Sequence, residues 1–457
     1  MFVTAGVSGQ RWARATPARS SHVSRTLPAV SGVRSVRMVA EPQLDKKQQR
    51  RRIMQGEKFN RRGFADTKEE AQGMMVEEFT SELLRQMREE AYILERDGIT
   101  VYLAKAYGFC WGVERAIALA YEARRQYPTE RIWITNEIIH NPNVNRRLQE
   151  MGVHFVPEAR DADGRVHKDL SGIQPSDVVV LPAFGATLEE MTYLDALGCR
   201  IVDTTCPWVS KVWNTVDKHH RAQCTSVIHG KWNHEETVAT ASFAEKYVIV
   251  RDLGQAEYLC DYILHGGDKQ TFLKTFRNAM SADFDPDRDL VKVGVANQTT
   301  MMKNETAAIG KMLEKTMMKK YGPAELSEHF VAFNTICDAT QERQDAMLEL
   351  VERELDVVLV VGGFNSSNTS HLVEIAEQRG LAVYHVDSAA RILPDNVIEH
   401  RTVHGEVVQT RGWLPHNGTD GGTVRLGVTS GASTPDRHVE ECLERVFLTH
   451  AVERARV

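Results

Sequence analysis

The chain alternates short apolar runs with segments of helical periodicity, and this alternation is the feature that most limits its fold. Each run is followed by glycine or polar loop residues and then by a helical pattern; examples are Val178–Leu181, Val291–Val295 and Val357–Val361. Short continuous runs of this kind indicate strands that are buried on both faces. Because strands that alternate with helices form parallel sheets covered by helices, we predict an α/β fold.

Length and charge narrow the class of protein further. The chain has 457 residues, of which 42% are hydrophobic, and this length predicts two or three α/β units. No apolar run approaches the roughly 20 residues that cross a bilayer, so we expect no membrane partner. The net charge is -6 and no long basic stripe follows the amino-terminal region, which argues against nucleic acid as a partner.

Residues 1–40 differ in composition from the remainder of the chain. They contain six arginines and six serines but no lysine, and the first acidic residue is Glu41. Such a segment without an apolar core is typical of an organelle transit peptide, with a disordered basic tail as the alternative. Residues 41–97 form a charged extension, packed on the outside, with a predicted helix over Glu77–Leu94. Docking and assembly both remain open as its role.

Three cysteines, Cys110, Cys206 and Cys337, each lie between a predicted strand and a predicted helix. Amides at a helix start stabilise negative charge, so they should lower the pKa of these thiols. The chain has no CxxC pattern, and three distant thiolates would hold an iron–sulfur cluster with one iron free to bind a substrate oxygen. The alternative for any cysteine is a buried apolar role, which we expect for Cys199, Cys224, Cys260 and Cys442.

Polar loops that follow predicted strands form a second candidate site. His140 and His234 each follow one strand, and loops rich in Ser, Thr and Asn at 365–370 and 429–434 follow two others. Loops after parallel strands line ligand crevices, where hydroxyls, amides and helix starts bind anions. Each such loop alone is more often simply a turn or a cap. Their shared position favours a phosphate pocket.

The pair His234 and Glu236 admits two chemical interpretations. With His140 and His229 it would suit the zinc site of a hydrolase, although the chain lacks a helical HExxH pattern. A carboxyl group beside a histidine and an anion pocket also suits proton delivery, with its pKa raised by neighbouring negative charge. A regulator that binds a cluster or a phosphate without turnover is a further alternative.

Six segments of the chain resemble one known family, and they occur in the same order. The segments are 106–116, 203–211, 297–300, 335–344, 363–371 and 427–435. They resemble the 4-hydroxy-3-methylbut-2-enyl diphosphate reductases, the last enzymes of the methylerythritol phosphate pathway, and the resemblance spans roughly residues 98–450. It implies reductive dehydroxylation of this allylic diphosphate to isopentenyl and dimethylallyl diphosphates, with two electrons from reduced ferredoxin.

The resemblance also implies an architecture and a cofactor. The three cysteines Cys110, Cys206 and Cys337 would hold a [4Fe-4S] cluster at the centre of three parallel-sheet α/β lobes. The substrate hydroxyl would bind the open iron. The implied lobes are 98–205, 206–336 and 337–450, with the strand at 98–109 joining the third lobe.

The resemblance assigns roles to residues around the cluster. Glu236 would deliver the proton that lets the hydroxyl leave as water, and Thr299 would orient that hydroxyl. The implied diphosphate ligands are His140, His234, Ser366, Ser367, Asn368 and Ser433.

One position departs from the bacterial members of this family. They carry a third diphosphate histidine in an Ala-His-Gly segment, whereas this chain reads Ala183-Phe184-Gly185. The departure resembles the plant and cyanobacterial branch and, with the Arg-rich amino terminus, predicts a plastid location in the chloroplast stroma. The sequence leaves open what replaces that histidine, the product ratio, the oligomeric state, the transit cleavage point and the ferredoxin docking surface.

Overall fold

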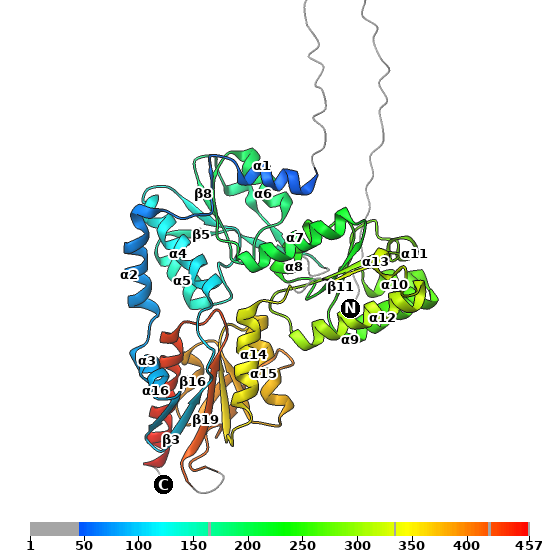
Figure 1. The fold of residues 1–457 in the computed structure, drawn as a ribbon. Helices are drawn as coiled ribbons and strands as arrows, with labels where there is room; N and C mark the ends of the chain where they lie inside the picture. Colours follow the sequence, from blue (N-terminus) through cyan, green and yellow to red (C-terminus); the bar gives the residue numbers. More distant parts are fainter. Residues whose placement is uncertain (1–44, 163–165, 333–334, 419–421, 456–457) are drawn as a thin grey trace, which may run out of the picture. The chain divides into compact units, whose positions relative to one another are not determined.

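Three β-sheets with helices packed against them organise the chain in the computed structural model (Figure 1). The structure describes residues 45–162, 166–332, 335–418 and 422–455, which fall within one unit of the chain. The predicted transit peptide, 1–40, lies outside the described residues. The three-lobed α/β fold predicted from the sequence is confirmed.

The first sheet is parallel and has the strand order β1-β9-β8-β4-β5. Every residue of its central strand β8 is buried, as expected for a strand covered on both faces. An antiparallel hairpin of β6 and β7 lies apart from this sheet in the strand pairing. The strands are β1 (Phe59–Asn60), β4 (Ile132–Ile134), β5 (Val153–Phe155), β6 (Glu158–Arg160), β7 (Val166–Lys168), β8 (Val178–Leu181) and β9 (Arg200–Asp203).

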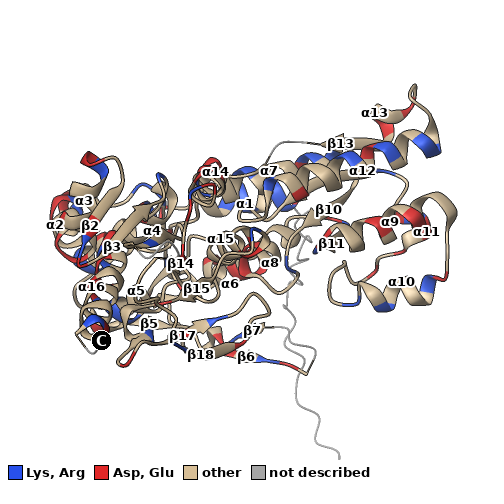
Figure 2. Cartoon of the chain, turned by 90° about the horizontal axis from the view of Figure 1, so that it is seen from below, with Lys and Arg blue, Asp and Glu red and all other residues tan. Residues whose placement is uncertain are grey.

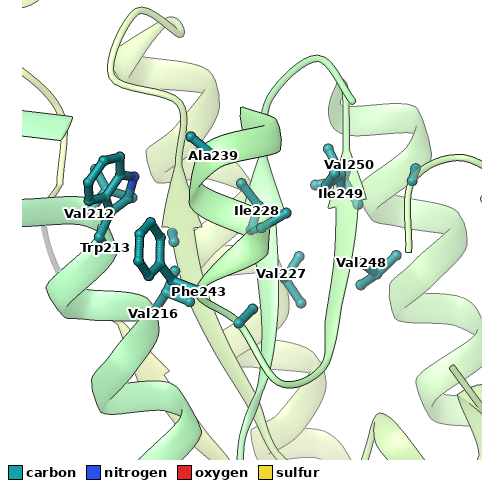
Figure 3. Packing of buried hydrophobic residues seen from close by; sticks show 14 of the residues in the cluster. Val212, Trp213, Val216, Val227, Ile228, Ala239, Phe243, Val248, Ile249 and Val250 are labelled. Carbon is teal, nitrogen blue, oxygen red and sulfur yellow. The ribbon is translucent and has the colours of Figure 1, made fainter. Parts of the chain in front are cut away.

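The second sheet is also parallel and has the order β11-β10-β12-β13. Figure 3 shows apolar side chains of β10 and β11 beside Trp213 and Phe243. The two aromatic rings stack with their centroids 4.5 Å apart. Trp213 belongs to α7 and Phe243 follows the end of α8, so this contact joins the two helices. The strands are β10 (Thr225–His229), β11 (Tyr247–Val250), β12 (Val293–Asn297) and β13 (Phe330–Ala332).

The third sheet is mixed, with the order β16-β17-β15-β14-β19-β3-β2 and β18 beside β17. Its β3 pairs in parallel with β19, although the two strands come from opposite ends of the described chain. Antiparallel strands form both of its edges. The strands are β2 (Ile93–Arg96), β3 (Ile99–Leu103), β14 (Val357–Val361), β15 (Val383–Val386), β16 (Ile392–Leu393), β17 (Val397–Arg401), β18 (Val407–Arg411) and β19 (Val424–Ser430).

Helices cover both faces of the first and third sheets. In the first sheet, α2, α4 and α5 pack on one face, and α6 and α7 pack on the other. In the third sheet, α3 and α16 cover one face, and α14 and α15 cover the other. The helices are α1 (Lys46–Met54), α2 (Lys68–Phe79), α3 (Glu82–Glu89), α4 (Trp111–Gln126), α5 (Pro142–Glu150), α6 (Leu188–Leu197), α7 (Pro207–Arg221), α8 (Glu235–Ser242), α9 (Leu253–His265), α10 (Lys269–Thr275), α11 (Pro286–Asp289), α12 (Lys303–Tyr321), α13 (Leu326–His329), α14 (Asp338–Leu350), α15 (Ser367–Gln378) and α16 (Asp436–Arg454).

The predicted strands at 178–181 and 357–361 have the bounds that the apolar runs indicated. The predicted helix over Glu77–Leu94 is confirmed for Glu82–Glu89, but its continuity and its end are wrong. Helix α2 ends at Phe79, and Ser81 starts α3 because its side chain accepts a hydrogen bond from the Leu84 amide at 3.0 Å. The segment then enters β2, which pairs with β3. The extension before residue 98 therefore contributes edge strands to two sheets rather than only an external helix.

Both signs of charge are interspersed along the outer helix α12, whereas α9 carries acidic side chains and no Lys or Arg (Figure 2). Within the described ranges, every helix is too short or too polar to cross a membrane.

Two glycines offer a test of how tightly the second lobe is packed. A Cβ on Gly294, in β12, would overlap the ring of His219, a fully buried residue of α7. Gly294→Ala should therefore destabilise the protein by about 1–3 kcal/mol through overpacking. Gly310, inside α12, has open space around it, so Gly310→Ala should stabilise by about 0.5–1 kcal/mol. Urea unfolding measures the free energy of unfolding of both variants. Equal changes in this free energy for the two substitutions would contradict this packing.

Candidate active site

The side chains singled out in the sequence lie in the loops at the carboxyl ends of parallel strands or in the first turns of the helices that follow these loops. Strands of all three sheets lead into these loops, which is where parallel α/β sheets bind ligands. The structure brings all of the predicted site residues together around one cavity. Its lining includes Cys110, Cys206, Cys337, His140, His234, Glu236, Thr299, Ser366, Ser367, Asn368 and Ser433, together with Phe184.

Each of the three cysteines in the cavity is the N-cap residue of a helix. Cys110 precedes α4, Cys206 precedes α7 and Cys337 precedes α14, as the pattern of strand, cysteine and helix predicted. A Cβ atom on Gly112 would lie 2.6 Å from the Cys206 sulfur and 4.0 Å from the Cys110 sulfur. The two sulfurs therefore lie close to the same position on α4. The three cysteines are half-buried, whereas the other four are buried, as predicted.

The predicted lowering of the thiol pKa values at these helix starts is wrong for two cysteines. Burial raises the pKa of Cys206 to about 12, and the neighbouring Cys110 and Cys337 add to the rise. Burial also raises the pKa of Cys337, with a further contribution from Cys110. Backbone amides act in the predicted direction, but burial outweighs them. Thiols that oppose one another's ionisation in this way need a bound cation to become thiolates together.

A buried guanidinium fastens the loop that carries Cys110. Arg343, on α14, is 4% exposed and donates hydrogen bonds to the Gly108 carbonyl at 2.8 Å and to the Ala339 carbonyl at 2.9 Å. The Cys110 amide donates to the Ala432 carbonyl at 3.0 Å. The sequence placed Arg343 in a family-like segment but did not reveal this role, because the partner in the Cys110 loop, the Gly108 carbonyl, is a backbone atom distant along the chain.

His140 and His234 face one another across the first and second lobes. Their Nε2 atoms lie 3.3 Å apart, and His140 Nδ1 contacts Glu137 Oε2 at 2.9 Å. Burial and the neighbouring His140 lower the pKa of His234. His234 Nδ1 accepts the Glu236 amide at 3.2 Å, so a neutral His234 carries its proton on Nε2 and directs it toward His140.

Phe184 occupies the position where the bacterial pattern has histidine. Its ring stacks on the His140 imidazole, with centroids 4.2 Å apart and an interplanar angle of 26°. It also meets the His234 ring edge-on at 5.7 Å. Phe184 therefore holds the two histidines by packing and supplies no hydrogen bond to the cavity.

Glu236 is buried and is held by Thr299 through two hydrogen bonds. The Thr299 amide donates to Oε1 at 2.6 Å, and the Thr299 hydroxyl donates to Oε2 at 2.9 Å. Burial raises the pKa of Glu236 to about 7, although these hydrogen bonds and His140 oppose the rise. The direction agrees with the sequence prediction, but the cause is burial and not neighbouring negative charge. Gln298, beside Thr299, lies 3.3 Å from the Ser367 hydroxyl and links this loop to the third lobe.

Three residues at the start of α15 and in the loop after β19 present amide and hydroxyl groups from the third lobe. Ser366 is the N-cap of α15, which begins at Ser367. Asn368 Oδ1 accepts the Ala432 amide at 2.9 Å, while its buried Nδ2 has no partner among the described protein atoms. The Ser433 hydroxyl donates to the His140 carbonyl at 3.1 Å. An unpartnered buried donor at the start of a helix is suited to an anionic ligand.

The four residues of the zinc alternative do not come together. His229 instead contacts the Thr306 hydroxyl at 2.8 Å, and Glu236 contacts Thr299. A different set is close enough to hold a cation, namely His140, His234 and Glu235, whose ligand atoms lie within 4.8 Å of one another. Glu235 was missed because a sequence shows adjacency to His234 but not the direction of a side chain.

The fold and the site define a three-lobed α/β protein with a central cavity lined by thiols and polar loops. The model of the LytB protein family matches residues 101–447. The chain belongs to the LytB protein family.

Relatives of the chain carry the name of a reductase. A Picosynechococcus protein named 4-hydroxy-3-methylbut-2-enyl diphosphate reductase is 56% identical over 91% of this chain and 100% of its own length. A Synechococcus protein of the same name is 57% identical over 88% of this chain and 99% of its own length.

A solved structure shows the same fold. It is the E-1-hydroxy-2-methyl-but-2-enyl-4-diphosphate reductase from Plasmodium falciparum, which is 21% identical to this chain. The two match with a TM-score of 0.54 over 75% of this chain and 86% of that chain.

The raised pKa of Glu236 predicts a dependence of stability on pH. Because this pKa is about 7 in the folded chain and roughly 4.3 in an unfolded one, protonation of Glu236 favours the folded state. Its contribution is complete below about pH 4 and is lost as the pH rises through about 7. Glu236→Gln should remove this loss and be more stable than the parent at pH 8 by at least about 1 kcal/mol. Anaerobic urea unfolding of both proteins at pH 5 and pH 8 measures the difference in their free energies of unfolding. The same difference at both pH values would contradict the raised pKa.

Proposed function

We propose that the chain is an iron–sulfur reductase that converts (E)-4-hydroxy-3-methylbut-2-enyl diphosphate to isopentenyl and dimethylallyl diphosphates, the last step of the methylerythritol phosphate pathway. The observation that carries the proposal is the convergence of three half-buried thiols and several anion-binding groups on one cavity. The reductase names of relatives at 56% and 57% identity support it.

Cys110, Cys206 and Cys337 would hold the cofactor, for which we propose a [4Fe-4S] cluster. Such a cluster supplies electrons and, at an iron without a protein ligand, a Lewis acid for the substrate hydroxyl. The donor set fits, because thiols that raise one another's pKa gain the cation that they need to ionise.

The diphosphate is bound mainly by neutral donors in this proposal. Asn368 Nδ2 is the buried donor that lacks a protein partner, and Ser366 and Ser367 stand at the start of α15. His140 and His234 face the same cavity from the other lobes, as does Ser433. Phe184 stands where bacterial members have a third histidine. It does not replace that hydrogen-bond donor; instead its ring packs against His140 and His234 and fixes their positions.

Glu236 supplies the proton that the leaving hydroxyl requires. With a pKa of about 7, its carboxyl group is protonated in a substantial fraction of molecules at neutral pH. The Thr299 amide holds one carboxyl oxygen, while the Thr299 hydroxyl, which donates to the other oxygen in this structure, can turn toward the substrate instead. The balance is two electrons and two protons: the C–O bond breaks, the hydroxyl leaves as water with one proton, and the other proton is added to carbon.

Reduced ferredoxin is the proposed electron donor, and the chloroplast stroma is the proposed location. The Arg-rich, acid-free composition of residues 1–40 and the cyanobacterial relatives support this assignment.

A zinc-dependent function is the second candidate, and the histidine pair favours it. A tetrahedral zinc with Zn–N distances of about 2.0–2.1 Å places two ligand nitrogens about 3.3 Å apart. The Nε2 atoms of His140 and His234 are separated by 3.3 Å, and Glu235 Oε2 lies 3.7 Å from His140 Nε2.

Anaerobic purification separates the two candidates. The reductase proposal predicts about four iron and four sulfide atoms for each chain, and turnover of the allylic diphosphate with reduced ferredoxin or a viologen. The control is the same protein exposed to air, which should lose both iron and activity. Active protein that contains zinc and no iron would overturn the proposal.

Substitutions in the cavity should separate catalysis from binding. Glu236→Gln removes the proton donor, so kcat should fall by about 10²–10⁴ while KM stays near the parent value. Asn368→Asp places an acceptor where the diphosphate needs a donor, so KM should rise at least about tenfold with iron content unchanged. The exposed Glu245 supplies the control substitution Glu245→Gln. Steady-state kinetics test both, and a parental kcat for Glu236→Gln would remove Glu236 from the proton path.

A further inference from the structure

The segment before residue 65 is built into the first sheet next to a cysteine of the cavity. Its strand β1 pairs in parallel with β9, with Phe59 opposite Ile201 and Asn60 opposite Val202. Strand β9 leads directly into the loop that ends at Cys206. The segment therefore lies beside one of the proposed cluster ligands, although it is distant from that ligand in sequence.

The turn that follows β1 has a defined conformation. The Asn60 side chain accepts the amides of Arg62 at 2.8 Å and Gly63 at 3.0 Å, which closes a turn. Gly63 has a φ of 84° and lies against the Glu122 side chain, where a Cβ atom would not fit. The Phe64 amide donates to Glu122 Oε2 at 2.8 Å. These contacts hold Arg61, the second residue of the turn, in one direction.

Arg61 contacts three groups around the Cys206 loop. Its guanidinium donates to the Thr205 carbonyl at 3.3 Å and to the Ser210 hydroxyl at 2.7 Å, and it lies 3.4 Å from the Asp203 carboxylate. Asp203 in turn accepts the Thr205 amide at 2.9 Å. The peptide before Cys206 is thus held from both sides by an ion pair.

A second guanidinium reaches the same peptide from α4. Arg115 donates to the carbonyls of Thr204 at 3.3 Å and Thr205 at 3.4 Å, and it also donates to the Arg61 carbonyl at 2.7 Å. The guanidinium groups of Arg61 and Arg115 and the carboxylate of Asp203 therefore lie together at the loop that presents Cys206, and removal of Arg61 would leave the Asp203 charge without this partner. A positive charge near an iron–sulfur cluster favours its reduced form and raises its reduction potential.

We propose that Arg61 is a positioning residue for Cys206, and that its guanidinium fixes the ligand loop and raises the reduction potential of the cluster held there. This inference rests on the proposed function. It gives the amino-terminal extension a role within the active site, distinct from docking or assembly.

Two substitutions and a matched control test the inference in the anaerobically purified full chain. Arg61→Met removes the charge and the hydrogen bonds, whereas Arg61→Lys keeps the charge but loses the planar fork. Arg62→Met is the control, because the neighbouring side chain is exposed and the change in net charge is the same. The readouts are the midpoint potential from an EPR-monitored redox titration and the rate at which cluster absorbance is lost in air.

Arg61→Met should shift the midpoint potential to more negative values and lose its cluster faster in air, whereas Arg62→Met should match the parent in both. Arg61→Lys should keep a potential close to that of the parent but lose its cluster faster. If Arg61→Met cannot be recovered folded, Arg61→Lys decides through cluster lability. Equal potentials in Arg61→Met and Arg62→Met, or parental lability in Arg61→Lys, would overturn the inference. A parent protein without a cluster would instead refute the proposed function.

Discussion

The contact between the loop after β4 and the loop after β19 is the constraint on which the cavity depends. Asn141 Nδ2 donates to the Ser433 carbonyl at 2.8 Å, and the Ser433 hydroxyl donates back to the His140 carbonyl at 3.1 Å. Gly363 lies against the same carbonyl, where a Cβ atom would not fit. Because groups on three sheets have to meet within the reach of one small ligand, a displacement of this contact would move several of them together.

Burial sets the charge state of the cavity in the absence of ligand. It raises the pKa of the Glu236 carboxyl and of the Cys206 and Cys337 thiols, and it lowers the pKa of His234. All of these shifts favour the uncharged form, since desolvation penalises whichever form is ionised. The protein therefore brings together groups that are close to neutral, and an anionic ligand and a metal cofactor would supply charges that balance one another.

Much of the fold was accessible from the sequence because its signals are local. The buried strands at 178–181 and 357–361 were predicted with their bounds, and the helices after Cys110, Cys206 and Cys337 begin where the pattern placed them. The predicted helix over 77–94 failed at Ser81, where a helix cap interrupts a continuous periodicity. The antiparallel edges of the third sheet were also missed. They are hairpins between neighbouring strands, β2–β3 and β17–β18, but β2 and β18 are short and partly exposed and carry no continuous apolar run.

The candidate site likewise combines features that the sequence predicted with features that only the fold shows. Residue types and their positions after strands pointed to the cavity lining, whereas Arg343 and Glu235 were missed because their roles depend on contacts made across the fold. Burial, which decides the pKa values, is likewise a property of the assembled lobes.

The attachment of α1 limits how the amino terminus can be processed. Lys46 donates hydrogen bonds to the carbonyls of Ser242 at 2.9 Å and Ala244 at 2.6 Å, and Lys47 pairs with Asp217 at 2.8 Å. These contacts are made at the start of α1, the helix that precedes β1 and the Arg61 turn. A peptidase that trims the chain without loosening this anchor would have to cut before Lys46, because the groups that hold Lys46 and Lys47 belong to α7 and to the end of α8.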